Sequence, residues 1–252
     1  MSSRQAVAFM VLALLSLPAA AADPPQKILL IGQGPDGHPA GSHEFMDGLK
    51  VLEDLLRPVR GLEVKAVKAE GAWPEGPDLI GRSDGVVLFL SEGAKWVSAD
   101  SKRQQALAQL AARKGGLVAL HWSIGCKEAG PIEPFLKLLG GCHGGPDRKY
   151  AVLETEAKPA TPRHPIAAGV EPVRVKDEFY YRLKFVKPEG SVKPVLTAAI
   201  DGQDYPVAWA WERPDGGRSF GFSGLHYHDN WKVPAYRKLV KQGILWSVKM
   251  LE

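Results

Sequence analysis

Two short, continuous apolar runs constrain the fold of this chain more than any other feature. Gly85 to Leu90 reads GVVLFL and Leu117 to Leu120 reads LVAL, and neither alternates with polar residues. Such a run is typical of a β-strand that is buried on both faces, as in a parallel sheet covered by helices. Between the two runs, the residues from about Ala99 to Lys114 predict a helix that ends at Gly115-Gly116.

The segments before these runs continue the same rhythm. Lys27 to Ile31 is an apolar run, and Leu62 to Val67 alternates like a strand. Between them, Ser42 is placed to cap a helix. The apolar stripe of that helix has spacings of four, three and four, and consists of Phe45, Leu49, Leu52 and Leu56. This order of elements predicts an α/β domain with a largely parallel sheet.

The second half of the chain has short strand candidates separated by Pro and Gly turns. Arg213 to Gly217 reads RPDGG, which is a good hairpin turn. We expect the strands to extend the same sheet in the antiparallel sense, and a closing helix from Pro234 to turn Tyr236, Val240 and Ile244 inward. The candidate strands are Tyr150 to Leu153, Val195 to Ile200, Val207 to Trp211 and Ser219 to Ser223.

The first residues resemble a secretory signal peptide. A basic tip with Arg4 precedes an apolar run of about a dozen residues and an Ala-rich end before Asp23. We therefore expect residues 1–22 to be a signal peptide and residues 23–252 to form one domain, exported to the periplasm or the extracellular space. No later apolar segment reaches the roughly 20 residues that span a bilayer, so no membrane span is expected after cleavage.

Charge and cysteine content limit only in part which partners and which redox state the sequence predicts. The chain has 32 basic and 28 acidic residues, so loss of Arg4 leaves a net charge of about +3. The basic residues are scattered among acids, which argues against nucleic acid as a partner. Oligomer formation is left open. Cys126 and Cys142 lie in glycine-rich loops of a chain expected in an oxidising compartment, and a disulfide and two free thiols are equally compatible with the sequence.

Histidines gather where the predicted strands end. In parallel sheets, ligands bind beyond the carboxyl ends of the strands, where the loops converge. Five of the seven histidines fall on three such loops, and His143 lies in a glycine-rich loop that could reach the same edge. The candidates at these loops are His38, His43 and Glu44 after the first strand, His121 and Trp122 after a buried strand, and His226 and His228 after the last strand.

These residue types suit acid–base or metal chemistry. His121 follows its strand directly, at a turn of the kind that presents a catalytic group. On an extended segment His226 and His228 would point the same way, so both could hold a divalent metal ion together with His121. Glu44 is a candidate catalytic carboxylate, although an acid in the first turn of a helix also has a purely structural explanation.

A second polar patch, Asp177-Glu178-Phe179-Tyr180-Tyr181, combines carboxylates with phenols. Aromatic rings pack on the C–H faces of sugars and carboxylates accept hydrogen bonds from hydroxyls, so the patch favours a carbohydrate ligand. Trp122 and Trp231 could serve in the same way, although most tryptophans belong to the core.

Read in order, these motifs resemble the ThuA-like family, named for trehalose utilisation, over nearly all of the chain after residue 22. The family has the fold of class I glutamine amidotransferases, so the resemblance implies a flavodoxin-like three-layer sandwich whose mainly parallel sheet is extended by antiparallel strands. The matching motifs are Gly37-His38, Ser42-His43-Glu44, Gly115 to His121, Leu139-Gly140-Gly141 with His143, His164-Pro165-Ile166, Asp177 to Tyr180, Pro206 to Trp209, the Gly217-Arg218 hairpin, Gly224 with its histidines, and Gly243 to Trp246.

The resemblance also bears on the chemistry. His121 stands where an amidotransferase has its cysteine nucleophile, and imidazole is a poor substitute for a thiolate, so glutamine hydrolysis is disfavoured. Family membership implies a role in the breakdown of oxidised sugars, particularly 3-keto disaccharides. We expect His121 and His226 to act on the proton and the oxygen of such a substrate, with Glu44 as a third catalytic group.

The remaining candidates are assigned to binding. His38, His43, Trp122, His143, Asp177, Glu178, Tyr180 and Trp231 are expected to contact the substrate, and His121, His226 and His228 are the candidate metal ligands. Two other functions stay open: a carbohydrate-binding protein without catalytic activity, and a metal-dependent hydrolase with another substrate.

Overall fold

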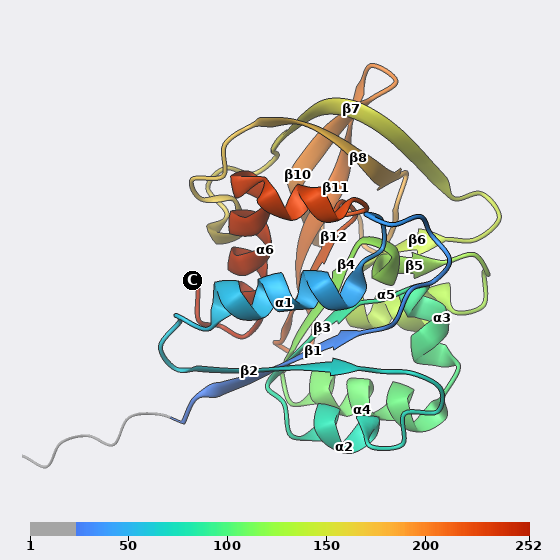
Figure 1. Ribbon diagram of the computed structural model, residues 1–252, viewed down its shortest axis with the longest axis vertical. Helices are drawn as coiled ribbons and strands as arrows, with labels where there is room; N and C mark the ends of the chain where they lie inside the picture. Colours follow the sequence, from blue (N-terminus) through green and yellow to red (C-terminus); the bar gives the residue numbers. More distant parts are fainter. Residues whose placement is uncertain (1–23) are drawn as a thin grey trace, which may run out of the picture.

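The computed structural model describes residues 24–252, which form an α/β domain around a nine-stranded sheet (Figure 1). The predicted signal peptide, residues 1–22, lies outside the described residues. The strand order is β2-β1-β3-β4-β12-β11-β10-β7-β8. The predicted fold class is confirmed, since the core strands of the sheet are parallel and helices cover both of its faces.

The parallel half of the sheet contains the continuous apolar runs. Its strands are β2 (Leu62–Lys68), β1 (Gln26–Gly32), β3 (Gly85–Phe89), β4 (Gly116–Leu120) and β12 (Arg218–Phe222). Every residue of β3 and β4 is buried. Alternate residues of β1 enter two cores, with Leu30 in one and Leu29 in the other. The sandwich therefore has three layers.

Helices α1 (Phe45–Leu56) and α6 (Pro234–Ser247) pack in the core that contains Leu30. On the other face, α4 (Ser101–Ala112) and α5 (Ile132–Leu139) pack with Leu29, beside the short helices α2 (Gly76–Gly81) and α3 (Gly93–Ser98). Figure 1 shows these two groups of helices on opposite sides of the strands. As predicted, Tyr236, Val240 and Ile244 are buried.

The antiparallel half continues the sheet from β12. It consists of β11 (Gln203–Glu212), β10 (Val192–Ile200), β7 (Lys149–Pro159) and β8 (Val173–Tyr181). A separate small sheet contains β5 (Gly125–Cys126), β6 (Gly141–Gly144) and β9 (Lys184–Phe185). Three 3-10 turns complete the structure: η1 (His121–Ile124), η2 (Pro165–Ala167) and η3 (His228–Lys232).

One local prediction is correct only in part and another is wrong. The strand predicted at Ser219 to Ser223, now β12, pairs antiparallel with β11 as expected, but it also pairs parallel with β4. The Arg213–Gly217 turn forms as predicted and reverses the chain after β11, so β12 returns in the direction of the parallel strands. Ser42 does not cap α1, because Glu44 occupies the N-cap position and Ser42 instead forms a β-bridge with Tyr227.

The two cysteines are free and buried, in β5 and β6. Within residues 24–252, no helix is both long enough and apolar enough to cross a membrane.

Candidate active site

The candidate active site lies where the loops after β1, β4 and β12 meet. The loop after β1 is hydrogen-bonded to the segment before α6, since the His43 N–H donates to the His226 carbonyl at 3.1 Å and the His228 N–H donates to the Gly41 carbonyl at 2.8 Å. Figure 1 shows the blue loop and the orange-red segment side by side. This contact brings histidines together that are far apart in the sequence.

The backbone is strained at two of these histidines. His121 has φ 48° and His43 has φ 53°, and both values lie in the left-handed region that side chains other than glycine rarely adopt. At His121 the strain lets the chain turn sharply from β4 into η1, which turns the imidazole toward the loops. Strained residues of this kind are concentrated at functional sites.

The protonation pattern of His121 follows from its surroundings. Its Nδ1 lies 2.8 Å from the Ser223 carbonyl oxygen, which can only accept a hydrogen bond. Nδ1 must therefore carry the proton, and Nε2 presents its lone pair. Three groups lie around that lone pair: His43 Nε2 at 2.9 Å, His226 Nδ1 at 3.2 Å and the Tyr180 hydroxyl at 3.2 Å.

The carboxylate of Asp36 orients His43. One Asp36 oxygen lies 2.7 Å from His43 Nδ1, and the other lies 2.7 Å from His38 Nδ1. Burial alone would raise the pKa of Asp36, but the bonds to His43 and His38 hold it well below its ordinary value. With the ionised carboxylate accepting from His43 Nδ1–H, the lone pair of His43 Nε2 points at His121.

Two imidazole lone pairs therefore face each other across 2.9 Å, with a third ring nitrogen beside them. Such an arrangement is repulsive unless a proton or a cation lies between the nitrogens. His43, His121 and His226 form a group whose ligand atoms all lie within 4.8 Å of one another. Nitrogens bound tetrahedrally to zinc at about 2.0–2.1 Å would be roughly 3.3 Å apart, close to the 2.9 and 3.2 Å that separate His121 Nε2 from His43 Nε2 and His226 Nδ1.

Burial favours the neutral, metal-binding form of His121 and His226. Burial, and next the charges of His43 and His226, lowers the pKa of His121 well below its ordinary value. Burial and the neighbouring His43 and His38 lower the pKa of His226 to about 4. Metal ions bind the neutral imidazole, and a carboxylate or carbonyl on the second ring nitrogen is the usual outer partner.

His226 is held in place by Asp177 rather than by its own loop. The completely buried Asp177 carboxylate accepts the backbone N–H groups of Leu225 at 2.7 Å and His226 at 3.0 Å. A third bond comes from the Glu178 N–H at 2.9 Å. Because these donors occupy the carboxylate, we assign Asp177 to positioning His226 and not to the sugar contact predicted from the sequence.

A cavity of about 190 Å³ opens beside the cluster, and several predicted binding residues line it. Tyr180 stacks between His121 and His143, with ring centroids 4.9 and 4.2 Å apart. Burial raises the pKa of Tyr180 well above its ordinary value, so its hydroxyl stays protonated. The cavity residues are His38, His43, Trp122, Lys127, His143, Arg148, Tyr150, Glu178 and Tyr180.

Glu178 is the carboxylate that lines this cavity. Its Oε1 lies 3.9 Å from His226 Nδ1, and burial raises the pKa of its carboxyl group. Glu44, the predicted catalytic carboxylate, instead accepts the Gly41 N–H at 2.7 Å and lies 3.5 Å from His228 Nδ1. Glu178 is therefore better placed than Glu44 to exchange a proton with a ligand at the cluster.

Two other predicted site residues do not join the cluster. The expected extended course ends at Tyr227, because His228 begins η3, so His226 and His228 do not point to one ion. His43 takes the place predicted for His228. Trp231 is 3% exposed and lies in the core with its ring 5.9 Å from Phe89, so its role is packing.

Cys126 does not replace the missing nucleophile. It is completely buried in β5, and burial raises the pKa of its thiol to about 11. The thiolate that acyl transfer requires is thus not available near neutral pH.

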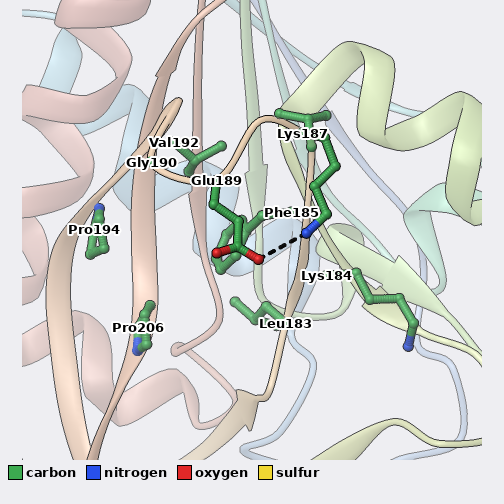
Figure 2. A pocket seen from close by; sticks show the side chains of 10 residues that line it. Leu183, Lys184, Phe185, Lys187, Glu189, Gly190, Val192, Pro194 and Pro206 are labelled. Carbon is green, nitrogen blue, oxygen red and sulfur yellow. Dashed lines mark hydrogen bonds and ion pairs between the residues drawn. The ribbon is translucent and has the colours of Figure 1, made fainter.

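A larger hollow, of about 610 Å³, lies over β9, β10 and β11 (Figure 2). Its lining is mainly apolar, and Figure 2 shows the Lys187–Glu189 ion pair at its edge, with a distance of 2.9 Å between the charged atoms. None of its lining residues is a histidine, and none belongs to the cluster. We call this hollow the apolar groove.

Asp36 and Arg148 are site residues that the sequence did not single out. Asp36 stands in Pro35-Asp36-Gly37, a pattern typical of an ordinary turn, and Arg148 follows a similar Pro146-Asp147 turn. A residue-type pattern cannot separate such turns from functional loops. Only the approach of the loop after β1 to His121 identifies Asp36 as part of the site.

The fold and the convergent imidazoles define an α/β protein with a histidine-lined site at the carboxyl edge of its parallel strands. Comparison with solved structures supports the fold. A putative ThuA-like protein from Bacteroides uniformis aligns over 92% of this chain and 95% of its own, with 13% identity and a TM-score of 0.68. One from Parabacteroides merdae aligns over 90% and 91%, with 16% identity and a TM-score of 0.67.

PurLQS from Thermotoga maritima is also similar, with 14% identity over 88% of this chain and 99% of that one, and a TM-score of 0.52. At such identities these likenesses show the fold alone. None of the curated proteins matches the sequence. The ThuA family model, described as trehalose utilisation, matches residues 38–247. This chain therefore belongs to the ThuA family and has the three-layer α/β fold predicted from its sequence.

Proposed function

We propose that this protein is a metal-assisted enzyme of carbohydrate breakdown that acts on a sugar bearing a carbonyl group. The observation that carries the proposal is the convergence of the lone pairs of His43 and His121, each fixed by an outer partner, with His226 beside them. A merely structural histidine cluster has no need of three ring nitrogens that meet at one point.

Imidazole nitrogens such as these three suit a divalent ion such as Zn²⁺. Such an ion would polarise a carbonyl oxygen or lower the pKa of a bound water. Asp36 and the Ser223 carbonyl would hold the two rings in the binding tautomer, which is the role of outer-shell partners in metal sites.

Glu178 is the proposed proton carrier. A carboxyl group works best as a general acid or base when its pKa is near the working pH, and burial moves Glu178 in that direction. A ketone acidifies the neighbouring C–H bond, so a carboxylate at this position could remove that proton while the enolate oxygen is held at the cluster.

The walls of the cavity support a sugar as the ligand. Trp122 supplies aromatic surface for C–H faces, whereas the two faces of the Tyr180 ring are covered by His121 and His143. The family description, trehalose utilisation, points to the same substrate class. Export of the protein, proposed from residues 1–22, would place this activity in the periplasm or outside the cell.

The test is turnover of a panel of 3-keto disaccharides and ordinary disaccharides by purified protein, with Zn²⁺, Mn²⁺ or a chelator. We expect turnover of a keto sugar that the chelator abolishes and an added ion restores. Turnover that persists in the chelator would argue for a proton relay among the three histidines in place of a metal ion. If the panel is unchanged while sugars still bind, a carbohydrate-binding protein becomes the better description.

A further inference from the structure

Three cavities adjoin the histidine cluster, and their charges differ. The cavity that includes His226 and His228 has Lys176 with two acids, Glu44 and Asp229. The cavity outside His43 has Lys68 with Glu44 and Asp47. Acidic residues thus exceed basic ones in both.

The third cavity, about 190 Å³ beside Tyr180, has the opposite balance. Lys127 and Arg148 line it, with Glu178 as the acid. We call it the basic cavity. Trp122, His143 and Tyr180 also line it, so a ligand bound there would lie beside Trp122 and close to His43 of the cluster.

Of the two cations, Arg148 has fewer interactions with other protein groups. Its guanidinium donates to the Gly145 carbonyl over 3.3 Å, and within residues 24–252 no carboxylate forms an ion pair with it. A guanidinium has five N–H donors, so most of them are left for a ligand. Its charge is also felt inside the cavity: burial, followed by the charges of Arg148 and Lys184, lowers the pKa of His143 to about 3.

Lys127, unlike Arg148, has a carboxylate partner, Glu92. Its backbone N–H donates to Glu92 at 3.0 Å, and its ammonium group lies 3.7 Å from the same carboxylate. The Lys127 side chain is 62% exposed, so it adds positive charge at the rim. The half-buried Arg148, in contrast, stands where water is partly excluded and charge-assisted hydrogen bonds are stronger.

We propose that the basic cavity selects an anionic sugar, whose carboxylate or phosphate is bound by Arg148 while the sugar ring lies beside Trp122. This inference rests on the proposed function, because it names the substrate class of the same site. The planar fork of arginine matches both oxyanions, and the positive cavity would also raise the encounter rate of an anion. The small volume favours one monosaccharide unit in the cavity.

The experiment is calorimetric titration of the protein with glucose, glucuronate and glucose 6-phosphate, at low and moderate salt. The matched variants are Arg148→Gln and Arg82→Gln, since Arg82 is exposed at the end of α2 and lines none of these three cavities. We expect at least one anion to bind more tightly than glucose. Arg148→Gln should weaken that anion about 10- to 100-fold and leave glucose unchanged, whereas Arg82→Gln should change neither. Whichever anion binds more tightly identifies the group.

Equal affinity for glucose and both anions, or an equal loss for all three in Arg148→Gln, would overturn the inference. Failure of the proposed function gives a different result. If the protein binds glucuronate through Arg148 but turns over no sugar, with or without metal, the anion site is supported and the proposed enzymatic function is contradicted. If the protein turns over neutral and acidic keto sugars equally, and does so equally in Arg148→Gln, the proposed enzymatic function is supported and the anion site is contradicted.

Discussion

The two halves of the sheet differ in burial and in what they contribute to the site. In the parallel half, β3 and β4 are buried throughout, and the loops after β1, β4 and β12 supply the three imidazoles. In the antiparallel half, β7 and β8 alternate between buried and more exposed residues. That half supplies the supports: Asp177 holds the backbone of His226, and Tyr180 stacks on His121. The parallel half thus supplies the imidazoles with the supports Asp36 and Ser223, and the antiparallel half adds a second set of supports together with Glu178.

The largest effect is expected from His121, which is the centre of the cluster. His121→Ala removes the nitrogen that His43, His226 and Tyr180 all approach, so we expect loss of bound metal and a fall in turnover of roughly 10²- to 10⁴-fold. His228→Ala is the matched control and should retain the metal. Metal content and kcat are measured on both, with circular dichroism to check folding. Equal metal loss in both variants would mean that His228 is a ligand after all.

The outer partner Asp36 should have a smaller effect than the ligands. Asp36→Asn removes the ionised acceptor that orients His43, so we expect metal affinity to fall about 10- to 100-fold with one ion still bound at saturation. Asp229→Asn, on the exposed Lys232 pair, is the control. Competition with a chelating dye measures both affinities, and unchanged affinity in Asp36→Asn would remove Asp36 from the site.

His143 tests the buried aromatic stack through its pH dependence. Its pKa in the folded protein is about 3, below its unfolded value near 6.5, so the unfolded chain binds more protons between those two values. Stability should therefore fall as the pH drops from 6.5 toward 3. His143→Phe keeps the ring but removes the titration, and we expect the fall to be smaller by about 1 kcal/mol or more. Urea unfolding of metal-free protein across this range gives the comparison, and parallel curves would contradict it.

The smallest effect is expected in the apolar groove. Lys187→Gln breaks an exposed ion pair with Glu189, so the free energy of unfolding should be unchanged within the error of the measurement. Turnover and metal content should match the wild type, because no cluster residue lines the groove. A loss of turnover comparable with that of Asp36→Asn would connect the antiparallel half to the chemistry more directly than the structure indicates.

The sequence predicts the parallel half well for a physical reason. A strand buried on both faces must be apolar throughout, so GVVLFL and LVAL stand out without further context. β8 was not predicted, although it alternates. Its inward positions are Val175, Asp177 and Phe179, and the buried acid interrupts the apolar pattern. Asp177, which interrupts the apolar pattern of β8, is also the residue that positions His226.

The site could be predicted in its members but not in its geometry. His43, His121 and His226 were all candidates, because polar residues after parallel strands converge at one edge. The choice between His43 and His228 depended on where the chain stops being extended, which a pattern of residue types does not reveal. Asp36 and Arg148 lie in turns, and their roles depend on contacts between loops.

The most direct measurement of the central claim is anomalous diffraction from crystals soaked in Zn²⁺, with data on both sides of the zinc absorption edge. The account predicts one strong peak between His43 Nε2, His121 Nε2 and His226 Nδ1, at about 2.0–2.1 Å from each nitrogen. A map without a peak at this point, from protein that is folded and saturated with zinc, would contradict it.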